Sequence, residues 1–343
     1  YSSAASDVYK RQILEVKVEH LTFEAPAPRF QRTCGKAEAR RAQEEVERAV
    51  KEHADAGRPY AKQLQAWCKS LGCDGRAAFL SAPPTRWAAP LKGAELQFAV
   101  RRLLRLELPG LAGHKCSCGA LLDPYGDHAD VCENQCGERN KRHTHVNEKG
   151  VNGPARQAKL STSIETVDLT EDTNGRPADT CLESGHGFGD NVKVCLDVVG
   201  CGTCADFYVN NASRWEGGAM HRAVDKKLRK ARRINAASAD LIVVPMAFES
   251  QGGLHPNWRI MYKTWAERWS AFGEGRDERA QAVLVRGWVA RTSVAIQRAQ
   301  CRLVSKMRAL ALDESYHGEE PHEWRAPDLD DVDARRAVLP SGG

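Results

Sequence analysis

The spacing of apolar residues predicts helices in the first part of the chain. Residues 38–56 are charged and rich in Ala, with valines at helical spacing, and residues 60–80 contain a second helical stretch. Residues 93–108 give an amphipathic pattern that ends at a Pro-Gly pair. The apolar side chains that we expect on the buried face of this helix are Leu96, Val100, Leu103 and Leu104.

Beyond residue 162 the apolar pattern becomes that of strands. Residues 163–169 alternate between apolar and polar side chains, and residues 192–199 are mostly β-branched and apolar. Residues 239–248 form a continuous apolar run, which is typical of a buried strand. A helix predicted at residues 218–237 separates the last two strands, so we expect an α/β core.

Two more helices are predicted after this core. Residues 256–272 are rich in Trp, and residues 276–312 have the pattern of one long helix. From residue 313 onward the chain is acidic with Pro and Gly, which predicts a disordered tail. The candidates for the buried face of the long helix are Val283, Leu284, Trp288, Val294, Ile296, Leu303, Met307 and Leu310.

Residues 114–136 are rich in Gly, Asp and Cys and show no period, as expected of a loop that is held by a metal. Cys116 and Cys118 are followed by His128 and Cys132, so four potential ligands lie within 17 residues. Three thiolates and one imidazole make the closed tetrahedral set of structural Zn²⁺. We therefore expect a zinc knuckle here, and chance clustering is the alternative.

Neighbouring residues fit such a knuckle. Gly119 and Gly126 permit tight turns around the ion, and Asp127 could orient the imidazole. Cys136 is a possible substitute ligand. Cys201 and Cys204 form a second Cys-x-x-Cys pair, which is either a metal or redox site or a turn at the end of a strand.

The other cysteines are scattered. The chain has 12 cysteines and no pattern of a signal peptide at its start, so disulfides are not expected. The scattered residues, which we interpret as small buried apolar side chains, are Cys34, Cys68, Cys73, Cys181, Cys195 and Cys301.

Two features bound the class of protein. No apolar stretch approaches the roughly 18–20 residues that a membrane span needs, so no membrane partner is expected. Residues 1–12, YSSAASDVYKRQ, resemble a translated sequencing adapter and do not begin with Met, so we expect a fragment of a longer transcript and exclude them.

A set of charged residues could carry metal-dependent chemistry. Asp197 interrupts an apolar strand, where a carboxylate is costly unless it is paired or bound to a metal, and Asp179 precedes it by 18 positions. Two such carboxylates from paired strands can hold Mg²⁺, with Glu165 on the preceding strand in support. Lys227 and Lys230, on the following helix, could position a water for attack on a phosphodiester.

The same helix is strongly basic. The net charge is +5, but residues 222–233 contain seven Lys or Arg and one acid. This local concentration of charge suits phosphates, and a solvated helix face is the alternative.

The order of these motifs resembles a known family. The Cys-Cys-His-Cys knuckle is followed by Lys141-Arg142-His143, then by Arg176-Pro177-Ala178-Asp179, and then by Leu196-Asp197-Val198. This order resembles the restriction-like endonuclease region of non-LTR retrotransposons, which follows the reverse transcriptase. Lys227-Leu228-Arg229-Lys230 looks like the family's downstream lysine motif, and Pro245 to Glu249 looks like its next core strand.

The resemblance implies a nuclease core of the PD-(D/E)XK type, with a central mixed sheet flanked by helices. It implies Asp179 and Asp197 as Mg²⁺ ligands, Lys227 or Lys230 as the catalytic lysine, and Glu165 in support. It also implies DNA as the substrate, and DNA or RNA of the element as the binding partner. It also implies the rest of the polyprotein as a partner and a nuclear location. The residues expected to contact nucleic acid are Arg142, His143, Arg222, Lys226, Arg229, Arg232 and Arg233.

The expected organisation follows from the same resemblance. Its parts are an adapter scar at 1–12, a helical remnant of the reverse transcriptase thumb at 13–110, the knuckle and Arg-His motif at 111–145, the nuclease core at 146–273, a long helix at 274–312 and an acidic tail at 313–343.

The sequence departs from the family at one catalytic position. Val199 stands where the family's Asp-x-Lys motif has its lysine, so the lysine must come from the helix. His143 is a DNA or metal contact in the family reading and an ordinary polar helix residue otherwise. Two rival functions therefore stay open: an inactive nucleic-acid-binding module on a decayed nuclease scaffold, and a structural protein adopted by the host.

Overall fold

The computed structural model describes residues 41, 44–53, 55–57, 60–82, 90–164, 178–183, 192–237, 241–273 and 276–312, without the side chains of residues 230 and 233–237. The chain divides into two compact units, Tyr1–Glu52 and His53–Gly343. The described residues of the first unit are helical, as the pattern of residues 38–56 predicts. All the described strands belong to the second unit.

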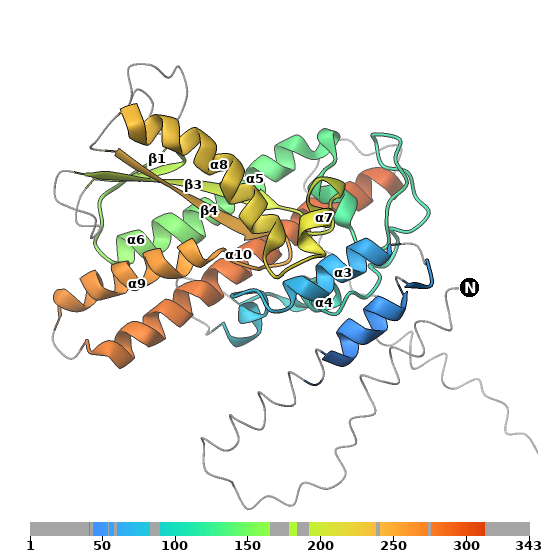
Figure 1. Ribbon diagram of the computed structural model, residues 1–343, viewed down its shortest axis with the longest axis horizontal. Coiled ribbons are helices and arrows are strands. Elements are labelled where there is room, and N and C mark those ends of the chain that lie inside the picture. Colours follow the sequence, from blue (N-terminus) through green and yellow to red (C-terminus); the bar gives the residue numbers. More distant parts are fainter. Residues whose placement is uncertain are drawn as a thin grey trace, which may run out of the picture. The chain divides into compact units, whose positions relative to one another are not determined.

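A four-stranded mixed sheet is the centre of the second unit (Figure 1). β1 (Thr162–Ile164), β2 (Thr180–Leu182) and β3 (Lys193–Cys201) are antiparallel neighbours, and β4 (Leu241–Glu249) pairs with β3 in parallel. The helix α8 (Gly218–Ala237) connects β3 to β4, because parallel neighbours need a crossover connection. The expected α/β class, with a mixed sheet flanked by helices, is confirmed.

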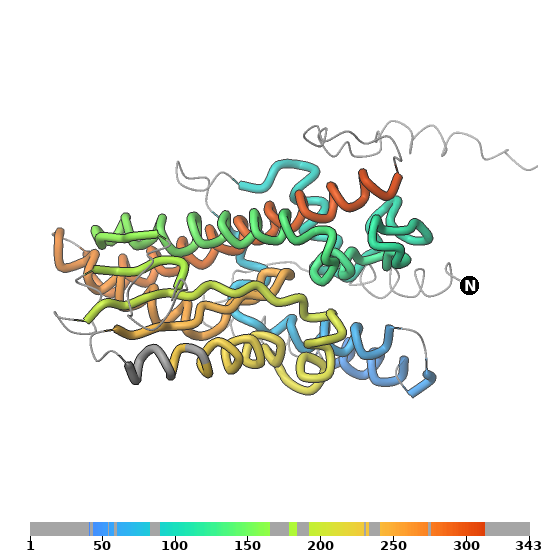
Figure 2. Tube along the Cα trace, turned by 90° about the horizontal axis from the view of Figure 1, so that it is seen from above, coloured from blue at the N-terminus to red at the C-terminus, as the bar shows by residue number. Residues whose placement is uncertain are grey.

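The helices lie on both faces of this sheet, as Figure 2 shows. The short helix α7 (Asp206–Ala212) and α8 pack against one face, where small apolar side chains such as Ala219, Ala223 and Ala247 form the contact. The larger core cluster covers the other face and includes Leu196, Val198 and Trp258. The sheet is therefore buried on both sides, which explains the nearly continuous apolar pattern of β3 and β4.

The helix of the Arg-His motif continues without a break across Gly150, Gly153 and Pro154. α5 (Cys136–Val146) runs into a π-helical segment, η4 (Asn147–Asn152), and then into α6 (Gly153–Gln157). A Cβ at Gly150 would lie 2.9 Å from the Thr292 side chain, so Gly at this position permits the close approach of the helix that contains Thr292. The widened turn thus accommodates residues that a regular helix would reject.

Two long helices complete the large core. α9 (Pro256–Ala271) and α10 (Glu278–Leu312) match the patterns at 256–272 and 276–312, and both pack against the α5 side of the sheet (Figure 1). Trp258, Trp265 and Trp288 are fully buried. Val283, which was expected on the buried face of α10, is instead 55% exposed. No helix among the described residues combines the length and apolar character that a membrane-spanning segment needs.

The segment before the knuckle is helical, but the buried face expected at residues 93–108 is only partly right: Val100 and Leu103 are half-buried against a core cluster. Its elements are α3 (Ala61–Ser70), η1 (Ala78–Ser81) and α4 (Gly93–Leu103). On α4 the buried side chains are Phe98, Ala99 and Arg102, whereas Leu96 and Leu104 are exposed. The helix turns this face inward because Arg102 pairs with buried carboxylates, which an apolar pattern does not reveal.

A disulfide between Cys181 and Cys195 corrects the expectation that these cysteines are unpaired thiols. The two residues face each other directly in the register of β2 and β3, so a bond between them closes the hairpin. Cys68, Cys73 and Cys301 are free and buried, as expected, and Cys34 lies outside the described residues.

Candidate functional site

The four side chains predicted to bind a metal come together. The ligand atoms of Cys116, Cys118, His128 and Cys132 all lie within 4.8 Å of one another. The sulfurs of Cys116 and Cys132 are 3.5 Å apart, and the Cys118 sulfur is 3.2 Å from His128 Nε2. Ligands at tetrahedral positions around one ion are separated by roughly 3.3–3.8 Å, given the usual metal–sulfur and metal–nitrogen distances. This cluster could therefore hold a metal ion.

The backbone around the cluster is fixed by one carboxylate that the sequence analysis missed. Asp123 accepts hydrogen bonds from the backbone N–H groups of Tyr125, Asp127 and His128, at 2.7 to 3.0 Å. Such a turn needs a left-handed residue, and Gly126 has a φ of 75°. The expected roles of Gly119 (φ 86°) and Gly126 in tight turns are confirmed.

Asp127, expected to orient the imidazole, is engaged elsewhere. Its carboxylate accepts two hydrogen bonds from Arg105, at 3.0 and 2.6 Å, and Arg102 lies 3.8 Å away. This bidentate pair ties the loop of the cluster to the segment after α4.

The other cysteines near this region do not join the cluster. Cys136 is exposed and lies outside the group of ligand atoms. Cys201 and Cys204 are buried, and their thiols donate to different backbone carbonyls, those of Phe248 and Gln63. Among the described residues, neither belongs to a group of side chains that could hold a metal.

The two predicted aspartates lie at the point where β2 begins beside β3. Thr180 pairs with Leu196, and the N–H of Asp179 donates to the Leu196 carbonyl at 3.0 Å. Continuing the antiparallel register by one residue places Asp179 opposite Asp197. The side chain of Asp197 lies on the face covered by α8, where it contacts Lys227.

Asp197 is nearly buried and is paired with the predicted lysine. Its exposed fraction is 6%, and its Oδ1 accepts a hydrogen bond of 2.8 Å from Lys227 Nζ. A carboxylate in a buried strand is tolerated because this ammonium group offsets its charge. Of the two candidate lysines, Lys227 is therefore brought to the aspartate, whereas the side chain of Lys230 lies outside the described residues.

Asp179 and His143 complete this group at the open edge of β3. Asp179 Oδ2 accepts a 2.7 Å hydrogen bond from the Val198 N–H and lies 3.1 Å from His143 Nε2. The same imidazole nitrogen is 2.9 Å from the Val198 carbonyl oxygen, and an acceptor at that distance requires a proton on Nε2. The two side chains thus extend the hydrogen bonding of β3 beyond the end of β2.

The pKa of His143 depends on charges from both Asp179 and Lys227. Burial lowers the pKa of His143, but the hydrogen bond and charge of Asp179, helped by the Val198 carbonyl, outweigh it and raise this pKa above its ordinary value. The charge of Lys227 acts in the opposite direction on the same imidazole. Lys227 therefore lies close enough to influence the Asp179 and His143 pair as well as Asp197.

A buried polar network fixes Thr180, the residue that follows Asp179. Thr180 donates to Asn147 Oδ1 at 3.0 Å and accepts from Asn152 Nδ2 at 3.1 Å. Both asparagines belong to the π-helical segment η4, whose widened turn presents them to the sheet.

Arg142, predicted to contact nucleic acid, instead points into the protein. It is 5% exposed and its guanidinium donates to the carboxylate of Asp130 and to the side-chain oxygen of Gln300. A buried and paired guanidinium does not support the expected phosphate contact. Glu165 lies outside the described residues, as does the side chain of Arg233.

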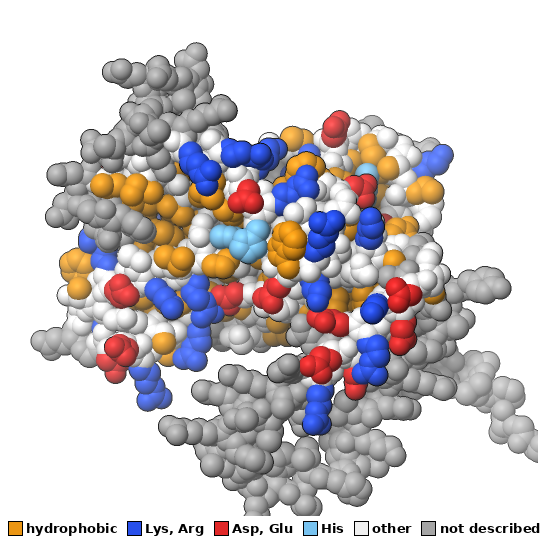
Figure 3. Space-filling model, in the orientation of Figure 1, with side chains coloured by type: hydrophobic (Ala, Val, Ile, Leu, Met, Phe, Trp, Pro, Cys, Tyr) orange, Lys and Arg blue, Asp and Glu red, His pale blue; other side chains and the backbone are white. Residues whose placement is uncertain are grey.

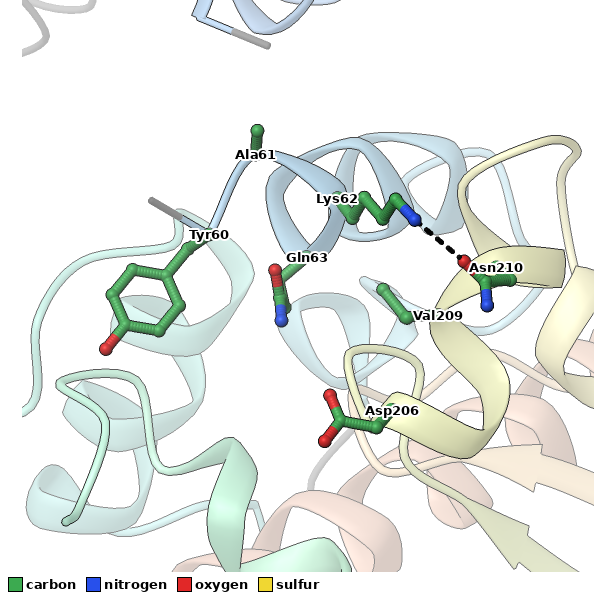
Figure 4. Close-up of a pocket in the computed structure, with 7 residues that line it drawn as sticks. All are labelled: Tyr60, Ala61, Lys62, Gln63, Asp206, Val209 and Asn210. Carbon is green, nitrogen blue, oxygen red and sulfur yellow. Dashed lines mark hydrogen bonds between the residues drawn. The ribbon is translucent and has the colours of Figure 1, made fainter. Parts of the chain in front are cut away.

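The remaining predicted contacts lie on the outer side of α8. Lys226, Arg229 and Arg232 are exposed and Arg222 is half-buried, and Figure 3 shows basic side chains gathered over this helix. A hollow of about 480 Å³ runs beside them. The hollow drawn in Figure 4, of about 420 Å³, lies between α3 and α7, and neither Asp179 nor Asp197 lines it.

Comparison with known proteins gives no assignment, because no family model matches the chain and no curated protein is similar to it in sequence.

Proposed function

We propose that this chain is a Mg²⁺-dependent DNA endonuclease of the PD-(D/E)XK type, derived from a non-LTR retrotransposon. The observation that carries the proposal is the Lys227–Asp197 ion pair, with Asp179 immediately before the adjacent strand β2. These three residue types are the ones that the resemblance assigns to the active site. The order of three antiparallel strands, a helix and a parallel strand supports the same reading.

The chemistry of the donor set fits the metal, since carboxylate oxygens are the protein ligands that Mg²⁺ prefers. Asp179 and Asp197 would hold the ion, which supplies polarisation of the phosphodiester and a lower pKa for a bound water. Lys227 would position the attacking water and stabilise charge on the phosphate oxygens. His143 and the Val198 N–H keep Asp179 in place.

The test is nicking of supercoiled plasmid by the purified chain with Mg²⁺. Asp197→Asn and Lys227→Met should each lower the nicking rate at least about a hundredfold, since each removes charge from the reacting centre. Lys263→Met is the control, because Lys263 is an exposed lysine of α9 away from the sheet edge. Nicking by Asp197→Asn at the parent rate would refute the proposal.

A second candidate function is favoured by how the acids are paired. Each aspartate already pairs with a basic side chain, Asp179 with His143 and Asp197 with Lys227, and neither belongs to a group of described residues that could hold a metal. This arrangement is also that of an inactive scaffold that binds nucleic acid through its knuckle and basic helix. A chain that binds DNA with salt-sensitive affinity, yet never nicks it, would support this alternative.

For the cysteine cluster we propose Zn²⁺ as the ion. Three thiolates and one imidazole are the ligands of closed structural zinc sites, with no position left for substrate. The burial of Cys116 and Cys132 in a hydrophobic cluster supports a structural role for the metal.

A further inference from the structure

An exposed aromatic ring lies beside the basic side of α8. Phe207, on α7, is 52% exposed. The guanidinium carbon of Arg222 lies 4.2 Å from the centre of this ring, and Lys226 Nζ lies 5.8 Å from it. The ring thus carries a cation over it and still keeps half of its surface open to solvent.

The stacked pair is held rigidly. Arg222 Nη1 donates a 2.8 Å hydrogen bond to Asn211 Oδ1, so its guanidinium is fixed at two points, by this bond and by the ring. Beneath it, α7 and α8 pack through Val209, Ala212 and Met220 in one buried cluster. The positions of Phe207 and Arg222 therefore depend on the core rather than on a loop.

The hollow next to this pair is lined by side chains that can bind the sugar-phosphate backbone of a nucleic acid. It is lined by Asn211, Arg222, Asp225, Leu228, Arg229 and Arg232, with three arginines against one aspartate. Arginine guanidinium groups bind phosphate oxygens, and planar guanidinium and aromatic groups stack on bases. On the other flank of α7, the hollow of Figure 4 adds Tyr60 and Lys62, again an aromatic ring and a basic group.

We propose that this surface binds a single-stranded nucleic acid, with an unpaired base stacked on the Phe207–Arg222 pair and phosphates on Arg229 and Arg232. A single strand is specified because a base within a duplex is stacked on its neighbours and cannot offer its face to the ring. The inference deepens the proposed function and rests on it for nucleic acid as the ligand. Because Lys227 extends from the same helix to Asp197, a strand held here runs next to the candidate nuclease site.

The experiment measures binding of fluorescent dT20 and of a duplex of the same length by anisotropy, with no Mg²⁺ added. Phe207→Ala should weaken dT20 binding about tenfold, in the range that loss of one stacked base gives, while Phe207→Tyr, which keeps a ring, should retain it. Binding of the duplex should change by less than about twofold. A U20 oligonucleotide distinguishes RNA from DNA as the favoured strand.

Matched controls lie at the far end of α9 and on α10. Phe272 is also exposed, at 49%, and also lies under a guanidinium, that of Arg268 at 5.1 Å, so Phe272→Ala should leave dT20 binding unchanged. Arg229→Gln should reduce the dependence of log affinity on log salt by about 0.7, as loss of one phosphate contact from a single strand does, and Arg286→Gln should not.

The outcomes separate this inference from the proposed cleavage. Equal dT20 binding by the parent and Phe207→Ala, or equal losses for Phe207→Ala and Phe272→Ala, would overturn the inference even if the parent nicks plasmid. Selective loss with Phe207→Ala in a chain that does not nick would support the surface and count against the nuclease. Tighter binding of duplex than of dT20 by the parent would overturn the single-strand assignment.

Discussion

Glu249, the last residue of β4, is the clearest single case of a charge that the fold opposes. It is fully buried, and burial raises the pKa of its carboxyl from 4.5 to about 7, although the charge of Arg76 works in the other direction. Since the folded protein holds this proton more tightly than the unfolded chain, the stabilisation from the protonated form is complete below about pH 4.5. It is lost as the pH rises toward 7.

We therefore predict that Glu249→Gln flattens the dependence of stability on pH in this window. The parent should lose about 3 kcal/mol of unfolding free energy between about pH 4.5 and pH 7 through this group, and the variant should not. Urea denaturation at several pH values measures the difference. Glu267→Gln, at an exposed residue of α9, provides the control, and parallel pH profiles for the parent and Glu249→Gln would contradict the prediction.

Single residues also show where sequence reasoning succeeds and fails. Asp197 could be selected because a carboxylate in an apolar strand needs a partner, and the charged side of the next helix offered Lys227. The inward direction of Arg142 could not be predicted, because its partner Gln300 lies 158 residues away in the chain. A basic residue beside a histidine motif gives no signal of whether it faces solvent or a buried acid.

At the scale of elements, periodicity predicts the long helices and the two long strands well. α8 begins and ends at the predicted residues, and α9, α10, β3 and β4 deviate by only a few residues. β2 has three residues and α7 has seven, which is too short for a pattern to emerge above chance. These two short elements nevertheless position side chains on which the functional proposals depend. Asp179 lies immediately before β2, and Phe207 lies on α7.

The disulfide between β2 and β3 was missed for a different reason. The expectation relied on the compartment in which disulfides form, whereas the pairing of Cys181 with Cys195 depends on a register that only the folded sheet defines. The bond links the strands just before Asp197 and just after Asp179, so it fixes the part of the sheet where the two carboxylates lie.

We predict that the double variant Cys181→Ala/Cys195→Ala is less stable than the parent by about 3 kcal/mol, since closing a loop of 14 residues restricts the unfolded chain by roughly that amount. Urea denaturation with and without a phosphine reductant measures the change. Reductant should shift the midpoint of the parent and leave that of the double variant in place. An equal response of both proteins would show that the bond adds no stability.

At the scale of the whole second unit, the cluster of three cysteines and one histidine packs together with α4 and α10. Cys116, Leu122 and Cys132 share one buried hydrophobic cluster with Phe98 of α4 and Val304 and Met307 of α10. The spacing of the four ligands predicted the cluster from local sequence, but its attachment to a helix about 170 residues later could not be predicted. If zinc holds this loop in place, removing the zinc should also lower the local stability of the C-terminal half of α10.

Cys118 and Cys136 provide a matched pair for testing this, because both are exposed cysteines of the same region and only Cys118 belongs to the ligand group. We predict one zinc per chain in the parent and in Cys136→Ser, and substantially less than one in Cys118→Ser, measured by release into a colorimetric chelator. Cys118→Ser should also lower the melting temperature by at least about 5 °C, since structural zinc contributes directly to folding free energy.

Amide hydrogen exchange in Cys118→Ser should then increase in residues 300–308 of α10 as well as in the knuckle, because the two segments share one core. Zinc retained by Cys118→Ser at full stoichiometry would reject the ligand set, whereas zinc lost without faster exchange in α10 would show that the loop folds independently of the helix it contacts.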